Sequence, residues 1–178
     1  MKYFDELTRS MKFLAKDDRT IFLGQCVGYP GNALYKTVCD IDASKRIELP
    51  VMEESQMGIS IGLALNGMIP VSIYPRWNFL ALATNQLANH LDKFPEMTAG
   101  RVRPKVIIRV CVGSTNPLHP GAQHCSDFTD AYKVLLNNVD VVRLEHPEEV
   151  FAAYQTAYES SNSTILVELA DLYVSVKK

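Results

Sequence analysis

The 178-residue sequence lacks the run of about eighteen apolar residues that a membrane-spanning helix needs. It also lacks an excess of charge, because its formal net charge is −2, and this gives no electrostatic argument for binding nucleic acid. The first residues, MKYFDELTRSMKFLAKDD, carry acidic side chains throughout and have no apolar centre, so we expect no signal peptide. These absences predict a globular protein without a nucleic-acid or membrane partner.

Cysteine is scarce as well. The four cysteines form neither a CxxC pair nor a compact disulfide framework, so we expect reduced thiols and a cytoplasmic protein. A metal site can be drawn from Cys111, His119, His124 and Cys125, but its spacing matches no zinc pattern. The sequence therefore predicts no metal site within this chain.

Segments with strand character alternate with segments of helical periodicity along the whole chain. This alternation predicts an α/β fold, with a doubly wound, mostly parallel sheet and helices on both faces. At this length we expect one domain over residues 1–178. The expected strands are 20–23, 46–49, 69–74, 105–111, 139–144 and 164–169. The expected helices are 1–15, 33–38, 78–93 and 126–136, together with one that follows Glu53 and one that begins at Pro147. Asn78 is the expected N-cap of the helix 78–93.

Two adjacent glutamates, Glu53 and Glu54, follow an expected strand and precede an expected helix. Pro50 ends the extended segment, because proline cannot donate a hydrogen bond to a neighbouring strand. Ligands of α/β proteins bind at the carboxyl ends of strands, so a carboxylate here is a candidate functional group. The alternative is that both glutamates are acids stabilised by the positive end of the helix dipole. Spacing alone favours this alternative.

The helix expected after these glutamates carries apolar residues at helical spacing, namely Met57, Ile61 and Leu65. Gly58 and Gly62 lie four residues apart on another stripe of the same helix. Glycine in a helix interior costs about 1 kcal/mol relative to alanine. Two glycines on one stripe therefore predict that something packs closely against it.

Three segments carry a family resemblance. They are GQCVGYPG (24–31), PVMEESQMGISIGLALNGMIPV (50–71) and GAQHCSD (121–127). They resemble the Gly-acidic-x-Val-Gly loop, the Pro-x-x-Glu-x-x-x-x-Gly-x-x-x-Gly run and the Gly-x-x-His-Ser-Gln segment of the pyrimidine-binding domain of thiamine-diphosphate enzymes. Gln25 departs from the pattern, since an acid is usual there. The similarity covers nearly the whole sequence and extends to the N-terminal half of the β subunit of 2-oxo-acid dehydrogenase decarboxylases, with transketolase more distant.

The resemblance implies that Glu53 is the cofactor-activating glutamate and that Met52 and Phe79 also bind the cofactor, thiamine diphosphate. In the family, a carboxylic acid shares a proton with N1′ of the aminopyrimidine and favours its imino tautomer, which removes the proton from C2 of the thiazolium. Phe79 falls on the position that stacks against the pyrimidine ring, a contact worth on the order of 1 kcal/mol beyond its buried area. Without the resemblance, Phe79 reads as an ordinary core aromatic residue.

His124 falls on the family's active-site histidine, which faces the substrate. Histidine suits proton transfer because its unperturbed pKa lies near 6.5. Composition alone would favour a loop histidine without a special role. Together, Glu53 and His124 are the predicted catalytic residues.

The family holds the diphosphate and its Mg²⁺ with a second domain that carries Gly-Asp-Gly, and this sequence contains no Gly-Asp-Gly. We therefore expect one subunit of a split enzyme, completed by a diphosphate-binding chain that supplies the Mg²⁺ ligands, in a heterotetramer. The substrate would be a small keto compound, and decarboxylation of a 2-oxo acid and ketol transfer both fit. The alternatives are a non-catalytic scaffold or regulatory subunit of the same fold and an unrelated nucleotide-binding regulator. The regulator is disfavoured because no phosphate-binding glycine loop precedes a helix.

Overall fold

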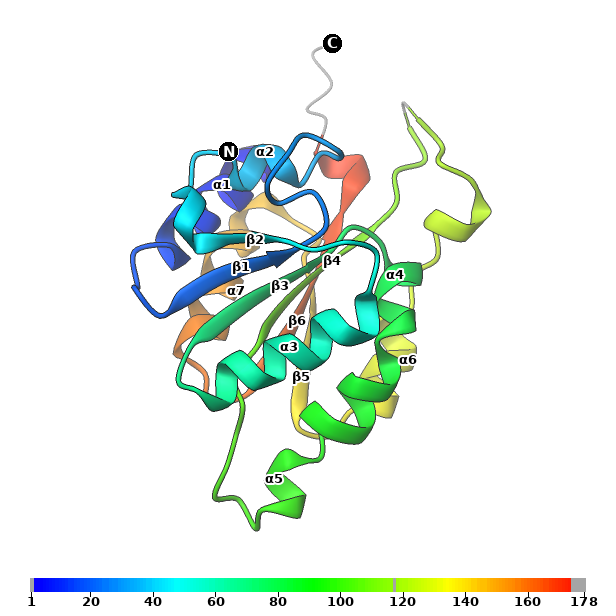
Figure 1. Cartoon of the computed structure of the whole chain (residues 1–178). Coiled ribbons are helices and arrows are strands. Elements are labelled where there is room, and N and C mark those ends of the chain that lie inside the picture. The colour runs from blue at the N-terminus through cyan, green and yellow to red at the C-terminus, as the bar shows by residue number, and fades with distance from the viewer. Residues whose placement is uncertain (1, 117, 174–178) are drawn as a thin grey trace.

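A wholly parallel six-stranded sheet forms the centre of the structure, a computed structural model that describes residues 2–116 and 118–173 (Figure 1). The strand order is β2-β1-β3-β4-β6-β5. This order confirms the predicted α/β class with a doubly wound parallel sheet. The strands are β1 (Thr20–Gly24), β2 (Arg46–Glu48), β3 (Ile69–Tyr74), β4 (Ile107–Val112), β5 (Val139–Arg143) and β6 (Ser163–Leu169).

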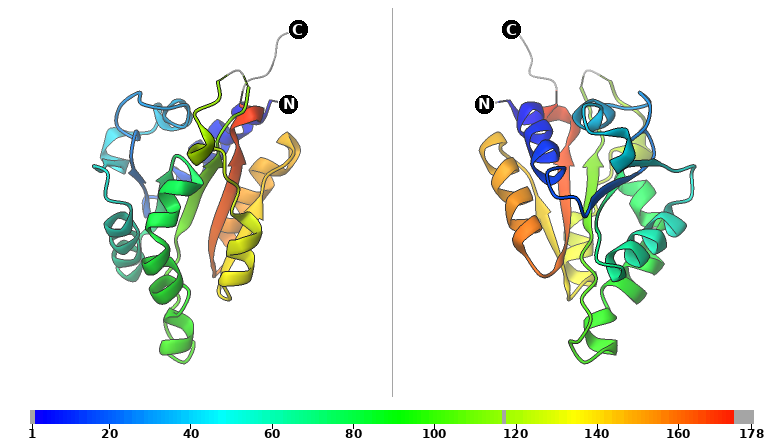
Figure 2. Two further views of the ribbon diagram at one scale, coloured as in Figure 1. Left: turned by 90° about the vertical axis from the view of Figure 1, so that its right-hand side faces the viewer. Right: turned by 60° about the vertical axis from the view of Figure 1, so that its left-hand side comes forward.

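Helices cover both faces of the sheet, and each face has its own apolar core (Figure 2). One core lies under α1 (Tyr3–Leu14), α2 (Tyr35–Val38) and α7 (Pro147–Glu159). The other lies under α3 (Glu53–Leu65), α4 (Trp77–Leu82), the π-helix Gln86–Leu91 and α6 (Thr129–Leu135). None of the described helices combines the length and the apolar character needed to cross a membrane.

Burial on both faces explains why the central strands have continuous apolar sequences. β3 is buried at all six positions and β4 at the first five of its six, because each lies between two neighbouring strands and under helices on both faces. Strands buried on both faces do not alternate polar and apolar residues. The edge strand β5 alternates instead, with Asp140 and Val142 exposed.

The prediction of one continuous helix over 78–93 is wrong, both in its first residue and in its continuity. The helix begins at Trp77 with Arg76 as N-cap, ends at Leu82, and resumes as the π-helix. Asn78 does not cap, because its side-chain oxygen lies 3.1 Å from the Nδ1 atom of His124. The Thr84 hydroxyl donates to the carbonyl of Ala81 (2.7 Å), a local bond that competes with regular helical pairing. A short helix, α5 (Phe94–Met97), also forms where a surface loop was expected to begin at Glu96.

The close packing predicted against the two glycines of α3 is not made within the described part of the chain. A Cβ atom placed on Gly58 would come no nearer than 3.9 Å to the side chain of Gln86, and one placed on Gly62 would meet nothing within 4 Å. Leu65, predicted to share a buried stripe with Met57 and Ile61, is 47% exposed. Met57 and Ile61 are buried, whereas the side of α3 that carries Gly58, Gly62 and Leu65 faces outward.

The strands of a parallel sheet end on the same side, so the segments that follow them meet there. In Figure 1 the loop after β1 and the loop after β4 rise at this end, whereas α5 projects from the opposite end. The connection from β2 to α3, whose first residue is Glu53, also follows the carboxyl end of its strand. The topology thus brings the segments 24–31 and 121–127 and the start of the segment 50–71 to one end of the sheet.

Candidate active site

Glu53 is the first residue of α3, and only 4% of its surface is exposed. The Gln25 side-chain amide donates to its Oε1 atom at 2.9 Å. The Tyr74 hydroxyl donates to its backbone carbonyl at 3.2 Å and ties the start of α3 to β3. Within the described part of the chain, Oε2 of Glu53 has no hydrogen-bond donor. A carboxylate held at this depth by a single amide is available for a further polar partner.

Glu54 behaves differently although it is adjacent. Its side chain is exposed and accepts hydrogen bonds from Asn85 (3.0 Å) and Gln86 (3.4 Å), which lower the pKa of this carboxyl. Glu54 therefore links α3 to the start of the π-helix. Stabilisation by the helix dipole does not require burial, so the dipole alternative accounts for Glu54 better than for Glu53.

Phe79 and His124 lie together in the structure. Their ring centroids are 5.7 Å apart with an interplanar angle of 35°. The Nδ1 atom of His124 is 3.1 Å from the side-chain oxygen of Asn78. An amide oxygen can only accept, so this contact assigns the proton of a neutral ring to Nδ1 and leaves Nε2 free to accept one. Asn78, which sequence reasoning treated as a helix cap, orients the predicted catalytic histidine.

Gly113 allows the segment that carries His124 to approach the end of β4. The Gly113 N–H donates to the backbone carbonyl of His124 at 3.0 Å. A Cβ atom on Gly113 would lie 2.0 Å from that same carbonyl oxygen, so any other residue would push the segment away. A glycine directly after a buried strand was the sequence signal for this close approach.

The carboxylate of Glu48 fixes the loop that carries Gln25. It accepts three backbone N–H bonds, from Cys26 (2.8 Å), Val27 (2.8 Å) and Gly28 (2.7 Å). Cys26 has a φ of 57°, so successive N–H groups converge on one anion. Sequence reasoning missed Glu48, because nothing in a strand-end glutamate shows that a distant loop will fold around it.

A pocket of about 290 Å³ lies at this end of the sheet. It brings the loop after β1, the start of α4 and the His124 segment together, and Phe79 and His124 both line it. Glu53 is connected to it through Gln25, whereas Met52, the half-buried N-cap of α3, is not part of its lining. The lining residues are Gln25, Cys26, Gly31, Asn32, Pro75, Arg76, Phe79, Pro120 and His124.

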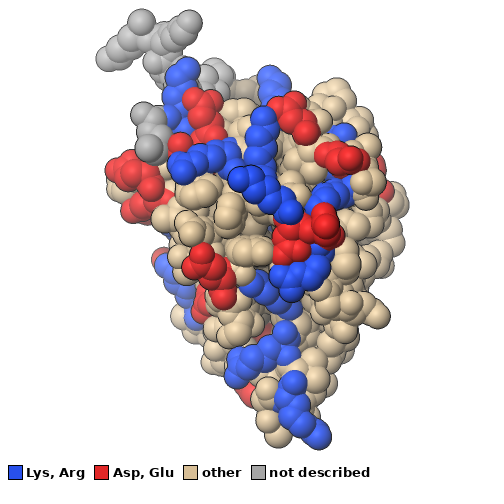
Figure 3. Space-filling model, turned by 90° about the vertical axis from the view of Figure 1, so that its left-hand side faces the viewer, with Lys and Arg blue, Asp and Glu red and all other residues tan. Residues whose placement is uncertain are grey.

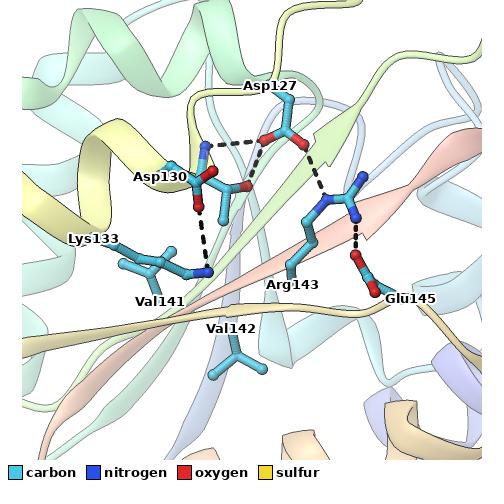
Figure 4. A pocket seen from close by; sticks show the side chains of 8 residues that line it. Asp127, Asp130, Lys133, Val141, Val142, Arg143 and Glu145 are labelled. Atoms are coloured by element: carbon cyan, nitrogen blue, oxygen red, sulfur yellow. Dashed lines mark hydrogen bonds and ion pairs between the residues drawn. The ribbon is translucent and has the colours of Figure 1, made fainter.

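A larger pocket of about 700 Å³ lies between α6 and β5, and none of the predicted site residues lines it (Figure 4). Each of its two cations is paired with an acidic side chain. Arg143 contacts both Asp127 (3.0 Å) and Glu145, and Lys133 lies 3.5 Å from Asp130. Burial alone would raise the pKa of Asp127, but its hydrogen bonds and ion pair outweigh burial and lower it. The cations of this pocket are thus already paired.

The face around α1 carries both signs of charge, interleaved across the surface in Figure 3. Lys12 pairs with Asp40 at 2.9 Å, and Arg9 pairs with Glu6 at 3.1 Å. Exposed pairs of this kind contribute about 0–1 kcal/mol each.

The comparisons with known proteins decide the family. The model of the transketolase pyrimidine-binding domain matches residues 8–174. The chain belongs to this family. One relative is the β subunit of the pyruvate dehydrogenase E1 component from Gracilaria tenuistipitata var. liui, which is 28% identical over 96% of this chain and 53% of that protein. Another is a 3-methyl-2-oxobutanoate dehydrogenase β subunit from Mycobacterium tuberculosis, which is 30% identical over 78% of this chain and 40% of that protein. The chain spans about half the length of these relatives.

Solved structures show the same fold. A structure described as "Split gene transketolase, inactive beta4 tetramer" aligns with a TM-score of 0.71 and 17% identity, over 95% of this chain and 51% of its own. Transketolase from Campylobacter jejuni aligns with the same TM-score and 14% identity, over 93% of this chain and 25% of its own. These alignments confirm the fold that the sequence predicted. The match to the transketolase pyrimidine-binding domain confirms the predicted family of thiamine-diphosphate enzymes.

Proposed function

We propose that this chain is the pyrimidine-binding subunit of a split thiamine-diphosphate enzyme. The enzyme would break or form a C–C bond in a 2-oxo acid or a ketose, and the chain would act with a partner that holds the diphosphate. The observation that carries the proposal is the buried Glu53 carboxylate at the start of α3, linked through Gln25 to a pocket that contains Phe79 and His124.

The residues present fit the pyrimidine half of the cofactor. Glu53 offers a buried carboxylate with one oxygen free of protein donors in the described chain, as a group that shares a proton with a ring nitrogen requires. Phe79 offers an aromatic face at the pocket, and Met52 precedes Glu53 at the helix start. His124 would exchange protons with the substrate through Nε2. When bound, the cofactor supplies a nucleophilic carbon and an electron sink for C–C bond chemistry.

Glu53, Phe79, Met52 and His124 remain predicted site residues, and their roles belong to this proposal. For Mg²⁺ the described residues offer no group of three His, Cys, Asp or Glu side chains that could hold a metal ion. Mg²⁺ prefers oxygen ligands in near-octahedral geometry, shared with substrate phosphates. We assign the metal and the diphosphate to the partner chain, because the Gly-Asp-Gly motif with which the family holds them does not occur in this sequence.

The partner would complete a heterotetramer. The structural neighbour described as a split-gene transketolase supports a division of this enzyme between chains. The outward face of α3 supports it too, because Gly62 is open and Ile59 and Leu65 are partly exposed there. We place the assembly in the cytoplasm. The two dehydrogenase β subunits favour a 2-oxo acid as substrate, whereas the transketolase neighbours favour ketol transfer.

Calorimetric binding of thiamine diphosphate and Mg²⁺ tests the proposal. The titration is performed on this chain alone and on this chain with the product of the neighbouring gene. We expect tight binding only in the mixture. Glu53→Ala should abolish it, and Glu54→Ala, which changes the adjacent exposed carboxylate, should leave it intact. Equal binding by wild type and Glu53→Ala would contradict the role of Glu53. Absence of binding in both samples would favour a non-catalytic scaffold.

A further inference from the structure

Arg76 has a position that the proposed function does not use. It follows Pro75 at the carboxyl end of β3 and precedes the first residue of α4. Its side chain lines the same pocket as Phe79 and His124. Among the described residues that line this pocket, Arg76 is the only lysine, arginine, aspartate or glutamate, and its guanidinium carries a permanent charge.

The guanidinium of Arg76 is held in place but not neutralised. Its Nη1 atom donates to the backbone carbonyl of Pro75 at 2.6 Å. No carboxylate of the described residues lies within 4.0 Å of it, whereas Arg109 and Arg143 each have a carboxylate partner within 3.0 Å. A guanidinium has five N–H donors, so most of those on Arg76 are left for another acceptor.

The larger pocket at β5 provides the internal comparison. There Arg143 and Lys133 are matched by three acidic side chains, and the pocket has no cation left for an external anion (Figure 4). The pocket at Phe79 and His124 has the opposite balance, with one cation and no acidic side chain among its described lining residues. Its electrostatic complement is a small anion.

We infer that Arg76 binds the anionic group of the substrate and so determines its specificity. This inference rests on the proposed function and extends it. A guanidinium pairs in a bidentate manner with either a carboxylate or a phosphate. The anion is therefore the carboxylate of a 2-oxo acid or the phosphate of a phosphorylated ketose. Held there, the substrate lies beside His124, which lines the same pocket.

The experiment is an NMR titration of the full chain, with ¹⁵N labelling of backbone and arginine side chains. The probes are pyruvate, inorganic phosphate and, as a neutral analogue of pyruvate, its methyl ester. The variants are Arg76→Gln and Arg76→Lys, with Arg101→Gln as the matched control. Arg101 is exposed and donates to the carbonyl of Thr98, so the control removes one positive charge away from the pocket.

We expect one anion to shift the signals of Arg76 and His124 in the wild-type chain and in Arg101→Gln with the same Kd. Arg76→Gln should weaken this binding about tenfold or more, as expected for loss of a charge-assisted hydrogen bond. For Arg76→Lys, which keeps the charge but not the planar fork of the guanidinium, the Kd of the anion should lie between those of the wild type and Arg76→Gln. Binding of pyruvate alone identifies a 2-oxo acid, and binding of phosphate alone identifies a phosphorylated substrate.

Two results would overturn the inference. One is that neither anion shifts the pocket signals, and the other is that Arg76→Gln, with an otherwise unchanged spectrum, binds the anion as the wild type does. Failure of the proposed function is distinguishable, because thiamine diphosphate is titrated separately into the same chain with its partner. Anion binding that depends on Arg76, without cofactor binding in the mixture, would keep the anion site and reject the cofactor.

Discussion

Arg109 and Glu168 form a fully buried ion pair, and we predict that removing one partner strongly destabilises the fold. Arg109 on β4 donates to Glu168 on β6 through Nε (2.6 Å) and Nη2 (3.0 Å), and both side chains have no exposed surface. Glu168 also accepts from the hydroxyls of Tyr154 and Tyr173. Burial alone would lower the pKa of Arg109, but the facing Glu168 raises it, so Arg109 stays protonated.

The perturbation is Arg109→Met, which keeps much of the side-chain volume and removes the cation. Removing one member of a buried pair costs about 3–5 kcal/mol, because the other charge is left uncompensated. For a chain of this length, that loss lowers Tm by roughly 6–20 °C. The control is Arg103→Met on the exposed surface, where we expect a change of at most about 0.5 kcal/mol.

Urea denaturation of four proteins measures this coupling: wild type, Arg109→Met, Glu168→Gln and the double variant. We expect the double variant to lose less stability than the sum of the two single losses. Each single variant leaves one buried charge without its partner, whereas the double variant has neither charge. The reasoning is refuted if Arg109→Met costs no more than Arg103→Met, or if the two single losses add.

Three further predictions concern two buried groups, Cys111 and Asp92, and the exposed Asp127. Burial raises the pKa of the Cys111 thiol to about 12, so iodoacetamide at pH 8 should leave it unmodified in the folded chain, as mass spectrometry would show; labelling as fast as in urea would contradict this. Asp92 is buried and accepts two backbone N–H bonds before β5, so Asp92→Ala should cost about 2–4 kcal/mol in urea denaturation, against little for the exposed Asp130→Ala. The pKa of Asp127 lies below the ordinary 3.8, so the stability that its charged form contributes is present above about pH 4 and is lost at lower pH. Asp127→Asn should therefore narrow the difference in Tm between pH 6 and pH 3. A wider difference in the variant would contradict this prediction.

Most of the fold was predictable because its elements are fixed by local patterns. β3 and β4 are apolar runs buried on both faces, and the first helix shows clear periodicity. Pro147 begins α7 as predicted, since proline fits the first helical position. The sequence also predicted the mostly parallel sheet, because strands alternate with helices along the chain.

The side-chain pairings of the site were not predictable in the same way. Asn78 has the propensity of a helix cap, but its contact with His124 joins residues 46 positions apart. Gln25 looked like a defect in a family pattern, whereas in the structure it is the donor to Glu53. Leu65 matched the periodicity of Met57 and Ile61 and is nevertheless exposed. Such pairings depend on tertiary geometry, which spacing along one element does not contain.

The most direct test of the central claim is the exchange of the C2 proton of bound thiamine diphosphate with deuterium, followed by ¹H NMR in the complex of this chain with its partner. The variants are Glu53→Gln, which can still form a hydrogen bond but cannot share a proton, and Glu54→Gln as the adjacent control. We predict rapid exchange in the wild type and the control, and exchange as slow as that of the free cofactor in Glu53→Gln, although the cofactor stays bound. Exchange in Glu53→Gln at the wild-type rate would contradict the account.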